Sequence, residues 1–382
     1  MAAELGVYVH IPFCARRCDY CDFATWTDRG HLVDEYVDAC RVDLERRTPA
    51  PATSVFFGGG TPSLIPADAL VRILAAIPRA PGAEVTVECN PDSVDQDKLT
   101  RYAAAGVNRV SFGVQSMRPH VLRELGRTHD PDNVAAAVES ARAAGIEQVS
   151  LDLIYGSAGE SVADWEATLD LALELEPDHV SAYALTVEAG APLAGLVASG
   201  ERRGPDDDDQ ATKYEVADER LTAAGYPWYE ISNWARPGRE CRHNLLYWGQ
   251  GEYLAIGCSA HGHTRADPGC AWVSRRWWNV RTPERYIRAI AGGESPEGGA
   301  EELDAATASE EQLVLALRTR AGIDVAALGD LLEELLDDGL VTRSDDRATL
   351  TRRGRLLAND VAVRLLMNRE RARPAVVSIG TR

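Results

Sequence analysis

Short apolar runs rich in Val, Ile and Phe recur along the first half of the chain, at spacings near 30 residues. Most are followed by a segment whose apolar positions repeat every three to four residues, the period of a helix. The runs predict strands at Val7–Ile11, Ser54–Phe57, Glu84–Glu88, Arg109–Gly113, Val149–Leu153 and His179–Ala184. Alternating strands and helices predict an α/β fold with a parallel sheet and crossover helices. Six units are too few for a closed eight-stranded barrel, so an open partial barrel and a doubly wound sheet both fit.

Polar residues mark where several of these helices begin. Ser93 followed by Gln96 is typical of a capping box, and Ser161 is expected to open the helix after the fifth strand. A further helix is expected over Asp206–Ala224. Its four leading acids, Asp206–Asp209, are interpreted as a solvated first turn that suits the helix dipole.

The second half of the chain changes character. The partial barrel is expected to cover residues 1–227, followed by an aromatic and histidine-rich segment over 228–290 and a Gly-rich linker over 291–300. Residues 301–368 show the helix, helix, hairpin, helix order of a winged helix, and 369–382 is expected to be a disordered tail. Winged helices often bind DNA, but residues 301–366 carry 14 acidic and 8 basic side chains, which favours a structural or protein-contact role.

The composition limits the possible partners and compartment. A net charge of −19 argues against nucleic acid as the main partner and repels anionic lipid headgroups. The N-terminus lacks the pattern of a secretory signal, and no stretch approaches the roughly 18 apolar residues of a membrane span. A cytoplasmic protein without an integral membrane segment is therefore expected, in which the eight cysteines remain reduced.

Three cysteines, Cys14, Cys18 and Cys21, follow the first predicted strand with CxxxCxxC spacing. A [4Fe–4S] cube takes a ligand at each iron, normally a thiolate, so three thiolates leave one iron open to a small molecule. The alternative is a structural zinc site with His10 as fourth ligand. The remaining cysteines have no tight spacing and are interpreted as core or neutral residues: Cys40, Cys89, Cys241, Cys258 and Cys270.

Other polar features come at the ends of the later strands. Gly58–Thr61 follows the second strand, Glu88 ends the third, Gln115 follows the fourth and Asp152 lies near the end of the fifth. Each could be a turn, capping or surface residue when taken alone. If the barrel prediction holds, they converge at the edge where barrel sites are built.

The segment HIPFCARRCDYCDF resembles the signature of radical S-adenosylmethionine proteins, in the branch of oxygen-independent coproporphyrinogen III oxidases and HemW-type heme chaperones. The resemblance implies a partial (β/α)6 barrel, a [4Fe–4S] cluster on Cys14, Cys18 and Cys21, and S-adenosyl-L-methionine bound to the open iron through its amino and carboxylate groups. It places Tyr20 beside the cluster and gives Arg127 a carboxylate partner. The implied cofactor contacts are Tyr8, Gly59, Gly60, Thr61, Glu88, Gln115, Arg127, Asp152 and Thr186. In LIYGSAGES the chain departs from its relatives, which usually have Pro and Gln after the first Gly.

The two branches differ after the third cysteine. The oxidases have a fourth cysteine two residues later, where this chain has Phe23. The segment HNLLYW resembles the HNxxYW motif associated with heme binding in HemW, which implies heme contacts from His243, Tyr247 and Trp248. His261 is a second possible imidazole source.

We therefore expect a heme chaperone that carries heme as cargo to heme-accepting apoproteins, with a homodimer possible. The alternatives are an oxygen-independent coproporphyrinogen III oxidase of porphyrin biosynthesis, which would make the chain an oxidoreductase, and a radical S-adenosylmethionine enzyme with another substrate. A structural zinc protein is the most distant of the four. Whether the chain is an enzyme stays open at this stage.

Overall fold

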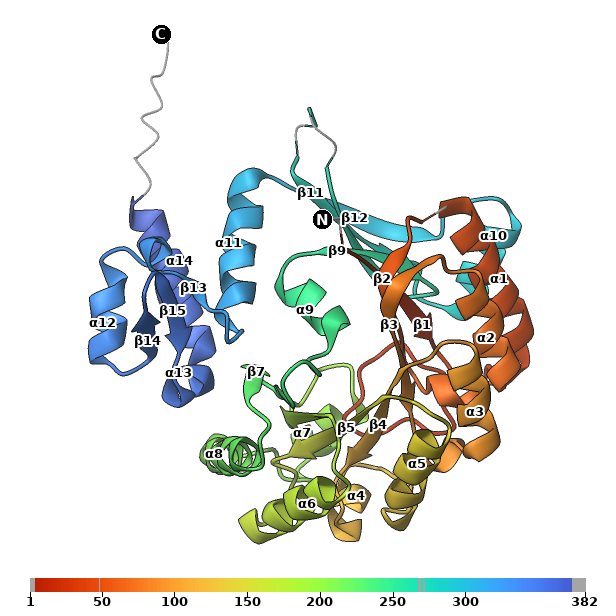
Figure 1. Ribbon diagram of the computed structural model, residues 1–382, viewed down its shortest axis with the longest axis horizontal. Coiled ribbons are helices and arrows are strands. Elements are labelled where there is room, and N and C mark those ends of the chain that lie inside the picture. Colours follow the sequence, from red (N-terminus) through yellow and green to blue (C-terminus); the bar gives the residue numbers. More distant parts are fainter. Residues whose placement is uncertain (1–3, 48, 267–268, 271, 373–382) are drawn as a thin grey trace. The chain divides into compact units, whose positions relative to one another are not determined.

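The computed structural model describes residues 4–47, 49–266, 269–270 and 272–372 (Figure 1). The chain forms two compact units. The first contains Met1–Trp228 and Ser232–Asp304, and the second contains Tyr229–Ile231 and Ala305–Arg382. The chain therefore enters the second unit twice, once through a three-residue segment and once through its C-terminal part.

The six predicted strands form the parallel part of one sheet and pair in chain order. A doubly wound sheet would reverse its strand order, so the open partial barrel is confirmed. The strands are β1 (Leu5–Ile11), β2 (Ala52–Gly59), β3 (Arg79–Cys89), β4 (Arg109–Gln115), β5 (Gln148–Tyr155) and β6 (His179–Ala184). The helices between them are α1 (Val33–Arg47), α2 (Ala67–Ala75), α3 (Gln96–Ala104), α4 (Pro119–Glu124), α5 (Asp132–Ala143) and α6 (Val162–Glu174).

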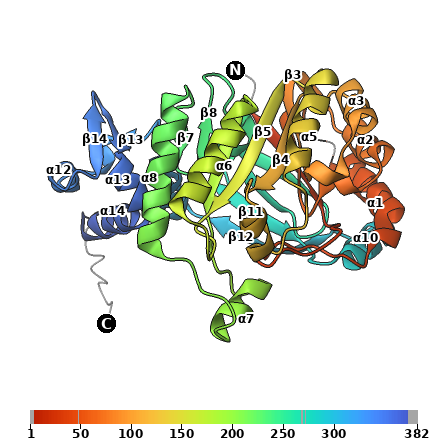
Figure 2. The ribbon, with the colours of Figure 1, turned by 90° about the horizontal axis from the view of Figure 1, so that it is seen from below.

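These helices cover the convex face of the sheet (Figures 1 and 2). Short 3-10 turns lie at Gly30–Leu32, Pro62–Leu64 and Pro91–Ser93. The helix-facing side chains of the strands, such as Val7, Val9 and Phe57, are fully buried. The apolar core of the first unit therefore lies between the sheet and the helices. The opposite, concave face of the sheet is not covered by these helices.

The sheet continues beyond β1. Strand β9 (Glu252–Ile256) pairs parallel to β1, and β10 (His261–Arg265), β11 (Ser274–Asn279) and β12 (Glu297–Leu303) follow as antiparallel neighbours. At the other end, β8 (Asn233–Ala235) pairs antiparallel to β6. The remaining helices of this unit are α7 (Pro192–Ala198), α8 (Asp207–Ala223), α9 (Arg242–Trp248) and α10 (Pro283–Ala291).

The predicted Gly-rich linker over 291–300 is partly wrong, because residues 297–303 form the edge strand β12. Its glycines are explained by the neighbouring strand. Gly299 pairs with Trp278, and a Cβ on Gly299 would lie 2.4 Å from the indole. The bare glycine lets the indole lie directly on β12, so a stretch that looks like a linker is part of the sheet.

Of the two predicted helix caps, the one at Ser161 is confirmed and the one at Ser93 is wrong. Ser161 caps α6 in a full capping box with Asp164, as expected. The N-cap of α3 is Asp95, which accepts from the Lys98 amide, and not Ser93. The acids before α8 are also more than a solvated turn: Asp206 is its N-cap, and Asp209 pairs with buried Lys213.

The second unit has the element order expected for residues 301–368. Helix α11 (Ala305–Leu317) and α12 (Leu331–Asp337) pack with a three-stranded sheet and with α13 (Arg352–Leu356) and α14 (Ala358–Ala372). The strands are β13 (Ile323–Asp324), β14 (Val341–Ser344) and β15 (Arg347–Leu350), with a 3-10 turn at Val325–Ala327. Of the tail predicted over 369–382, the first four residues belong to α14 and the rest lie outside the described residues.

A short strand, β7 (Trp228–Glu230), brings the earlier part of the chain into this unit. The Tyr229 carbonyl accepts from the Arg320 amide, Glu230 forms a bridge with Thr319, and Ile231 packs on the core around Leu317 and Leu335. Residues 229–231 are therefore structural members of a unit whose other residues follow about 75 positions later. Within the described part of the chain, no helix is both long enough and apolar enough to cross a membrane.

Candidate functional site

The three cysteines lie in the loop that follows β1, and all three are partly exposed. The loop is held by main-chain hydrogen bonds. The Cys14 amide donates to Trp26 (3.0 Å), the Trp26 amide donates to Pro12 (2.8 Å), and the Asp19 amide donates to Leu125 (3.3 Å). The thiols are thus presented from an anchored segment.

Two polar side chains from distant elements contact the thiols. The Thr61 hydroxyl lies 3.6 Å from the Cys14 sulfur, and Arg127 Nη1 lies 3.6 Å from the Cys18 sulfur. Burial raises the pKa of Cys14, and it raises the pKa of Cys21 to about 11. Tyr20 lies close enough to Cys18 and Cys21 for their charges to raise its pKa further, beyond the larger effect of burial.

This donor set fits an iron–sulfur cluster. Partly buried thiols with raised pKa values lose their protons when a metal binds them, and the positive charge of Arg127 opposes part of the rise in the pKa of Cys14. Among the described residues, no three His, Cys, Asp or Glu side chains are arranged around a single ion. A [4Fe–4S] cube takes one thiolate per iron, so its protein ligands do not have to share one ion.

His10, the fourth ligand of the zinc alternative, is engaged elsewhere. Its Nδ1 lies 3.1 Å from the Tyr8 hydroxyl and its Nε2 lies 2.9 Å from the Ala24 carbonyl. Burial lowers the pKa of His10 to about 4. Both ring nitrogens are therefore used within the barrel, and the structure does not bring His10 to the thiols as a ligand.

The glycine loop after β2 lies against the cysteine loop. A Cβ on Gly60 would lie 2.8 Å from the carbonyls of Ile11 and Phe13 and 3.1 Å from the Cys14 sulfur. At Gly59, φ is +108° and a Cβ would lie 2.4 Å from the His10 ring. Glycine is required at both positions because any side chain would collide with β1 or the cysteine loop.

Two partly buried carboxyl groups, those of Glu88 and Asp152, lie near each other beyond this loop. Glu88 Oε2 accepts from the Gly59 amide (3.2 Å), and Asp152 Oδ2 accepts from the Ser111 hydroxyl (2.8 Å). Burial, and secondarily the charge of Asp152, raises the pKa of Glu88 to about 8. Burial also raises the pKa of Asp152. Hydrogen bonds from Ser181 and Ser111 and the charge of Arg109 oppose part of that rise. Two neighbouring carboxyl groups suit a ligand that brings positive charge or hydrogen-bond donors.

Gln115 and Arg127 lie at the same edge of the sheet, near the cysteine loop. Gln115 ends β4 with φ +63°, a strained conformation for a non-glycine residue. Arg127 Nη2 donates to the Gly113 carbonyl (2.6 Å), which fixes the guanidinium next to Cys18. The predicted residues from β1 to β5 thus come together at one edge of the sheet. Thr186 is exposed after β6, and its hydroxyl bonds only its own segment, at Ala184 (3.4 Å).

The concave face is polar along several strands. Closed barrel interiors are usually filled with Val, Ile and Leu. Here the residues alternating with the helix-facing apolar ones include Ser54, Glu84, Thr86, Glu88, Arg109, Ser111, Ser150, Asp152, His179 and Ser181. The hydroxyl of Ser150 lies 2.8 Å from His179 Nδ1, and Arg109 Nη1 donates to Gln148 (2.8 Å). A polar interior suits a polar ligand. The strand pattern in the sequence predicted the strands but not the polar character of this face.

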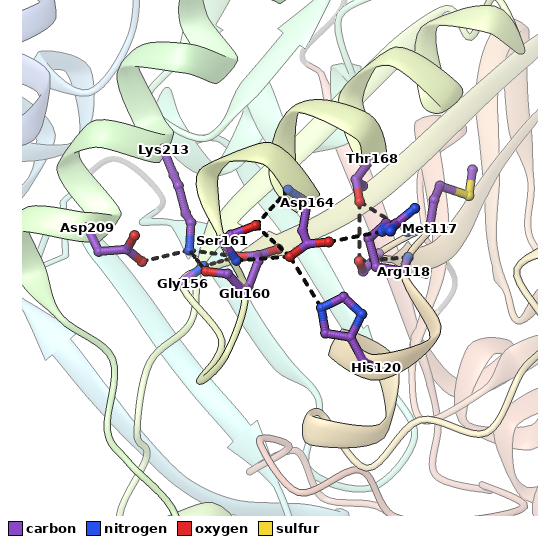
Figure 3. A network of polar contacts seen from close by, with 11 residues as sticks. Met117, Arg118, His120, Gly156, Glu160, Ser161, Asp164, Thr168, Asp209 and Lys213 are labelled. Atoms are coloured by element: carbon purple, nitrogen blue, oxygen red, sulfur yellow. Dashed lines mark hydrogen bonds and ion pairs between the residues drawn. The ribbon is translucent and has the colours of Figure 1, made fainter.

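The loop Gly156–Ser161, which follows β5, is held by α8, which lies beside α6 (Figure 2). Figure 3 shows the contacts. Lys213 Nζ donates to the Glu160 carbonyl (2.7 Å) and pairs with Asp209 (2.6 Å) and Glu160 Oε2 (3.2 Å). Glu160 in turn accepts from the Gly156 amide (2.7 Å). The loop is thereby fixed at the same end of the sheet as Asp152.

Helix α9, which carries the HNLLYW motif, lies on the concave side of the sheet (Figure 1). Its start binds Glu84, which accepts from the amides of Arg242 (3.2 Å) and His243 (3.1 Å). The His243 side chain is 0% exposed. Its Nδ1 lies 2.8 Å from the Ser54 hydroxyl and its Nε2 lies 2.9 Å from the Tyr247 hydroxyl.

His243 is therefore a core residue in this arrangement, stacked on Phe56 and lying against Gly6. Burial lowers its pKa to about 3. Tyr247 and Trp248 are half-buried, and the Tyr247 ring contacts Tyr253 edge-on at 4.6 Å. His261 is exposed on β10. The structure thus separates the two imidazoles predicted to handle heme, one buried and one accessible.

Comparison with known proteins gives matches over most of the chain. The family described as "Radical SAM superfamily" matches residues 8–172, and the family described as "HemN C-terminal domain" matches residues 303–357. The chain is 45% identical to the heme chaperone HemW of Mycobacterium tuberculosis over 95% of this chain and 94% of that protein. It is 33% identical to the heme chaperone HemW of Bacillus subtilis over 93% and 97% of the two chains.

A solved structure gives the same fold. Coproporphyrinogen III oxidase (HemN) from Escherichia coli, titled a radical SAM enzyme, superimposes with a TM-score of 0.80 over 95% of this chain and 90% of that chain. At 23% identity this match establishes the fold and not the reaction.

Proposed function

The chain belongs to the family of HemW heme chaperones within the radical S-adenosylmethionine superfamily, and we propose from this membership that it binds heme and delivers it to hemoproteins. The observation that carries the proposal is the 45% identity to a heme chaperone over 95% of the chain. Family membership also implies a [4Fe–4S] cluster and S-adenosylmethionine.

In this proposal, Cys14, Cys18 and Cys21 hold three irons of the cluster. Arg127 and Thr61, each 3.6 Å from a cysteine sulfur, stabilise the thiolates. A reduced cluster of this kind supplies one electron for radical chemistry on S-adenosylmethionine. The reducing conditions of the cytoplasm, the compartment that we propose, keep such thiols available.

The residues at the strand ends would hold S-adenosylmethionine. The backbone of Gly59 and Gly60 lies beside Cys14 without any side chain, so a ligand can approach it closely. Glu88 and Asp152 would accept hydrogen bonds from a cationic amine or from hydroxyl groups, and a bound cation would restore the charge on Glu88. Tyr8, Tyr20, Gln115 and Thr186 stay predicted contacts.

Heme binding and transfer can be tested directly. The chain is purified without oxygen, reconstituted with iron and sulfide, loaded with hemin and desalted. We expect a Soret band that persists and then moves to an added apo-hemoprotein when the two are separated by size. The control is the same protein mixed with free hemin, since transfer from the chaperone has to exceed passive uptake.

Conversion of coproporphyrinogen to protoporphyrinogen in the presence of S-adenosylmethionine and a reductant would overturn the proposal in favour of the oxidase. Tightly held zinc, with about two irons or fewer per chain after full reconstitution, would remove the cluster. A measurement of mass in solution tests the homodimer, which stays a prediction.

A further inference from the structure

All eight histidines lie in the described part of the chain, and they differ in what each imidazole can still bind. Five are buried: His10, His129, His179, His243 and His263. Of the other three, His120 lies 3.3 Å from the Asp164 carboxylate. His31 and His261 are exposed, and neither imidazole makes a hydrogen bond within the described residues. Among the described histidines, only these two imidazoles are exposed and make no hydrogen bond.

The surroundings of these two rings are different. His31 is on the 3-10 turn before α1 and packs on no aromatic ring of the described chain. His261 is paired directly across the strands with Trp278, with ring centroids 6.0 Å apart and an interplanar angle of 31°. The Trp278 side is open, since this residue is 36% exposed. The indole rests on Gly299, which offers no side chain to cover it.

The strand register shows which face these rings share. Antiparallel partners point to the same side of a sheet, so His261 and Trp278 share a face with the next pair, His263 and Arg276. His263 is also the partner of Tyr253, whose ring contacts Tyr247 of α9. Trp277, between them, points the other way and is buried near Arg47 of α1. His261 and Trp278 therefore lie on the concave face, where the predicted cofactor residues also lie.

His261 is also near the end of β1 from which the cysteine loop leaves. Burial lowers the pKa of His10, and a positive charge on His261 would lower it further, so the two imidazoles lie close to each other. His10 Nε2 bonds the carbonyl of Ala24, three residues after Cys21. Burial and the charge of Arg276 lower the pKa of His261 itself, which keeps its imidazole neutral and able to bind a metal.

From this placement we infer that His261 supplies the imidazole that binds the heme iron, with Trp278 as the flat apolar surface beside the porphyrin. Imidazole is a common axial ligand of heme iron, and an indole face suits a planar macrocycle. The inference rests on the proposed function, because it names the ligand of the cargo. His243 would have to break its bonds to Ser54 and Tyr247 and leave the interior before it could bind iron. His261 needs no such rearrangement.

The test uses the full-length, cluster-reconstituted chain and hemin. The Kd is measured by Soret titration, and the axial ligand is identified by electron paramagnetic resonance of the ferric complex. We expect His261→Ala to weaken heme binding at least about tenfold, the lower range for disturbing a metal site, and to remove the imidazole signature. Added imidazole is expected to restore that signature. Trp278→Leu is expected to weaken binding while the imidazole signature stays.

His31→Ala is the matched control, because it removes another exposed and uncommitted imidazole, and its Kd and spectrum are expected to equal those of the parent chain. Iron content and cluster absorption are measured in every variant to show that folding and cluster loading are unchanged. His261→Gln, which keeps a polar side chain, repeats the test if the alanine variant loses its cluster.

An unchanged Kd and spectrum in His261→Ala would overturn the inference, and so would loss of the imidazole signature in His243→Ala alone. Both results leave the proposed function standing, because the parent chain still binds heme. Failure of the parent chain to retain heme would instead reject the proposed function and this inference with it.

Discussion

Lys213 has an amino group with no solvent exposure, and it holds the loop after β5 from one side. Burial raises the pKa of Glu160 even though Lys213 lies against it. A buried ion pair is costly to form, but removing only one partner is costlier, because the other charge stays buried without compensation.

We therefore predict that Lys213→Met lowers the free energy of unfolding by about 3–5 kcal/mol, the range for breaking a buried pair. The double variant Lys213→Met with Glu160→Gln is expected to recover part of that loss, because the carboxylate that remains, Asp209, is partly exposed, whereas Glu160 is not. Urea unfolding of the parent chain and of both variants measures the difference. A double variant less stable than Lys213→Met would show that the pair is not coupled in this way.

The same residues show how far sequence reasoning reaches at this scale. Asp209 and Lys213 are four positions apart, a spacing that indicates a helix-surface pair. The solvated interpretation of Asp206–Asp209 was nonetheless incomplete, because the burial of Lys213 depends on Glu160, which is 53 positions away in the sequence. Likewise, nothing near His243 indicates that Ser54 and Glu84 hold it inside the barrel.

At the scale of elements, α6 shows how one hydroxyl fixes a helix start. Ser161 accepts from the Asp164 amide (3.1 Å), and Asp164 accepts from the Ser161 amide (3.1 Å) (Figure 3). The Ser161 hydroxyl is also the largest cause that lowers the pKa of Asp164 to about 2. The serine therefore satisfies the helix end and supports the charge that pairs with Arg118.

We predict that Ser161→Ala lowers the free energy of unfolding by about 1 kcal/mol, typical of a lost N-cap. Thr212→Ala is the control, because this hydroxyl lies inside α8 and bonds only the Asp208 carbonyl. Its removal is expected to be neutral or slightly stabilising, since alanine favours helix interiors. Equal losses in both variants, measured by urea unfolding, would argue against a special role of the cap.

Elements with a strong internal pattern could be predicted, and elements that depend on a neighbour could not. The six parallel strands carry apolar residues at alternating positions, on the side that packs against the helices. The edge strand β12 contains Gly298 and Gly299 and has no such run. It becomes a strand because β11 supplies both the hydrogen bonds and the Trp278 indole that covers Gly299.

For the whole molecule, the alternation of elements predicted a parallel sheet with crossover helices, and the family resemblance favoured the partial barrel over the doubly wound sheet. The partition of the chain could not be predicted in this way. Residues 229–231 belong to the second unit because Arg320 and Thr319 provide their backbone partners and the Leu317–Leu335 core covers Ile231. No local pattern reports partners that far along the chain.

This partition predicts opposite effects of one substitution. In the full chain, Ile231→Ser removes an apolar contact and is expected to lower stability by about 1–3 kcal/mol. A chain ending at Asp304 lacks the apolar core on which Ile231 packs, and the same substitution is expected to reduce aggregation because it makes a less covered side chain polar. Thermal unfolding and light scattering of the four proteins test this, and effects of the same sign in both chains would contradict it.

During synthesis, residues 229–231 are made before the residues that cover them. A ribosome adds about 5–20 residues per second, so Tyr229–Ile231 is made on the order of ten seconds before the strands and helices that cover it. During that interval the apolar core that covers Ile231 is absent, and exposed apolar side chains are what chaperones and proteases recognise. Folding of the second unit covers this side chain, so the segment is protected only after the residues of that core have been made.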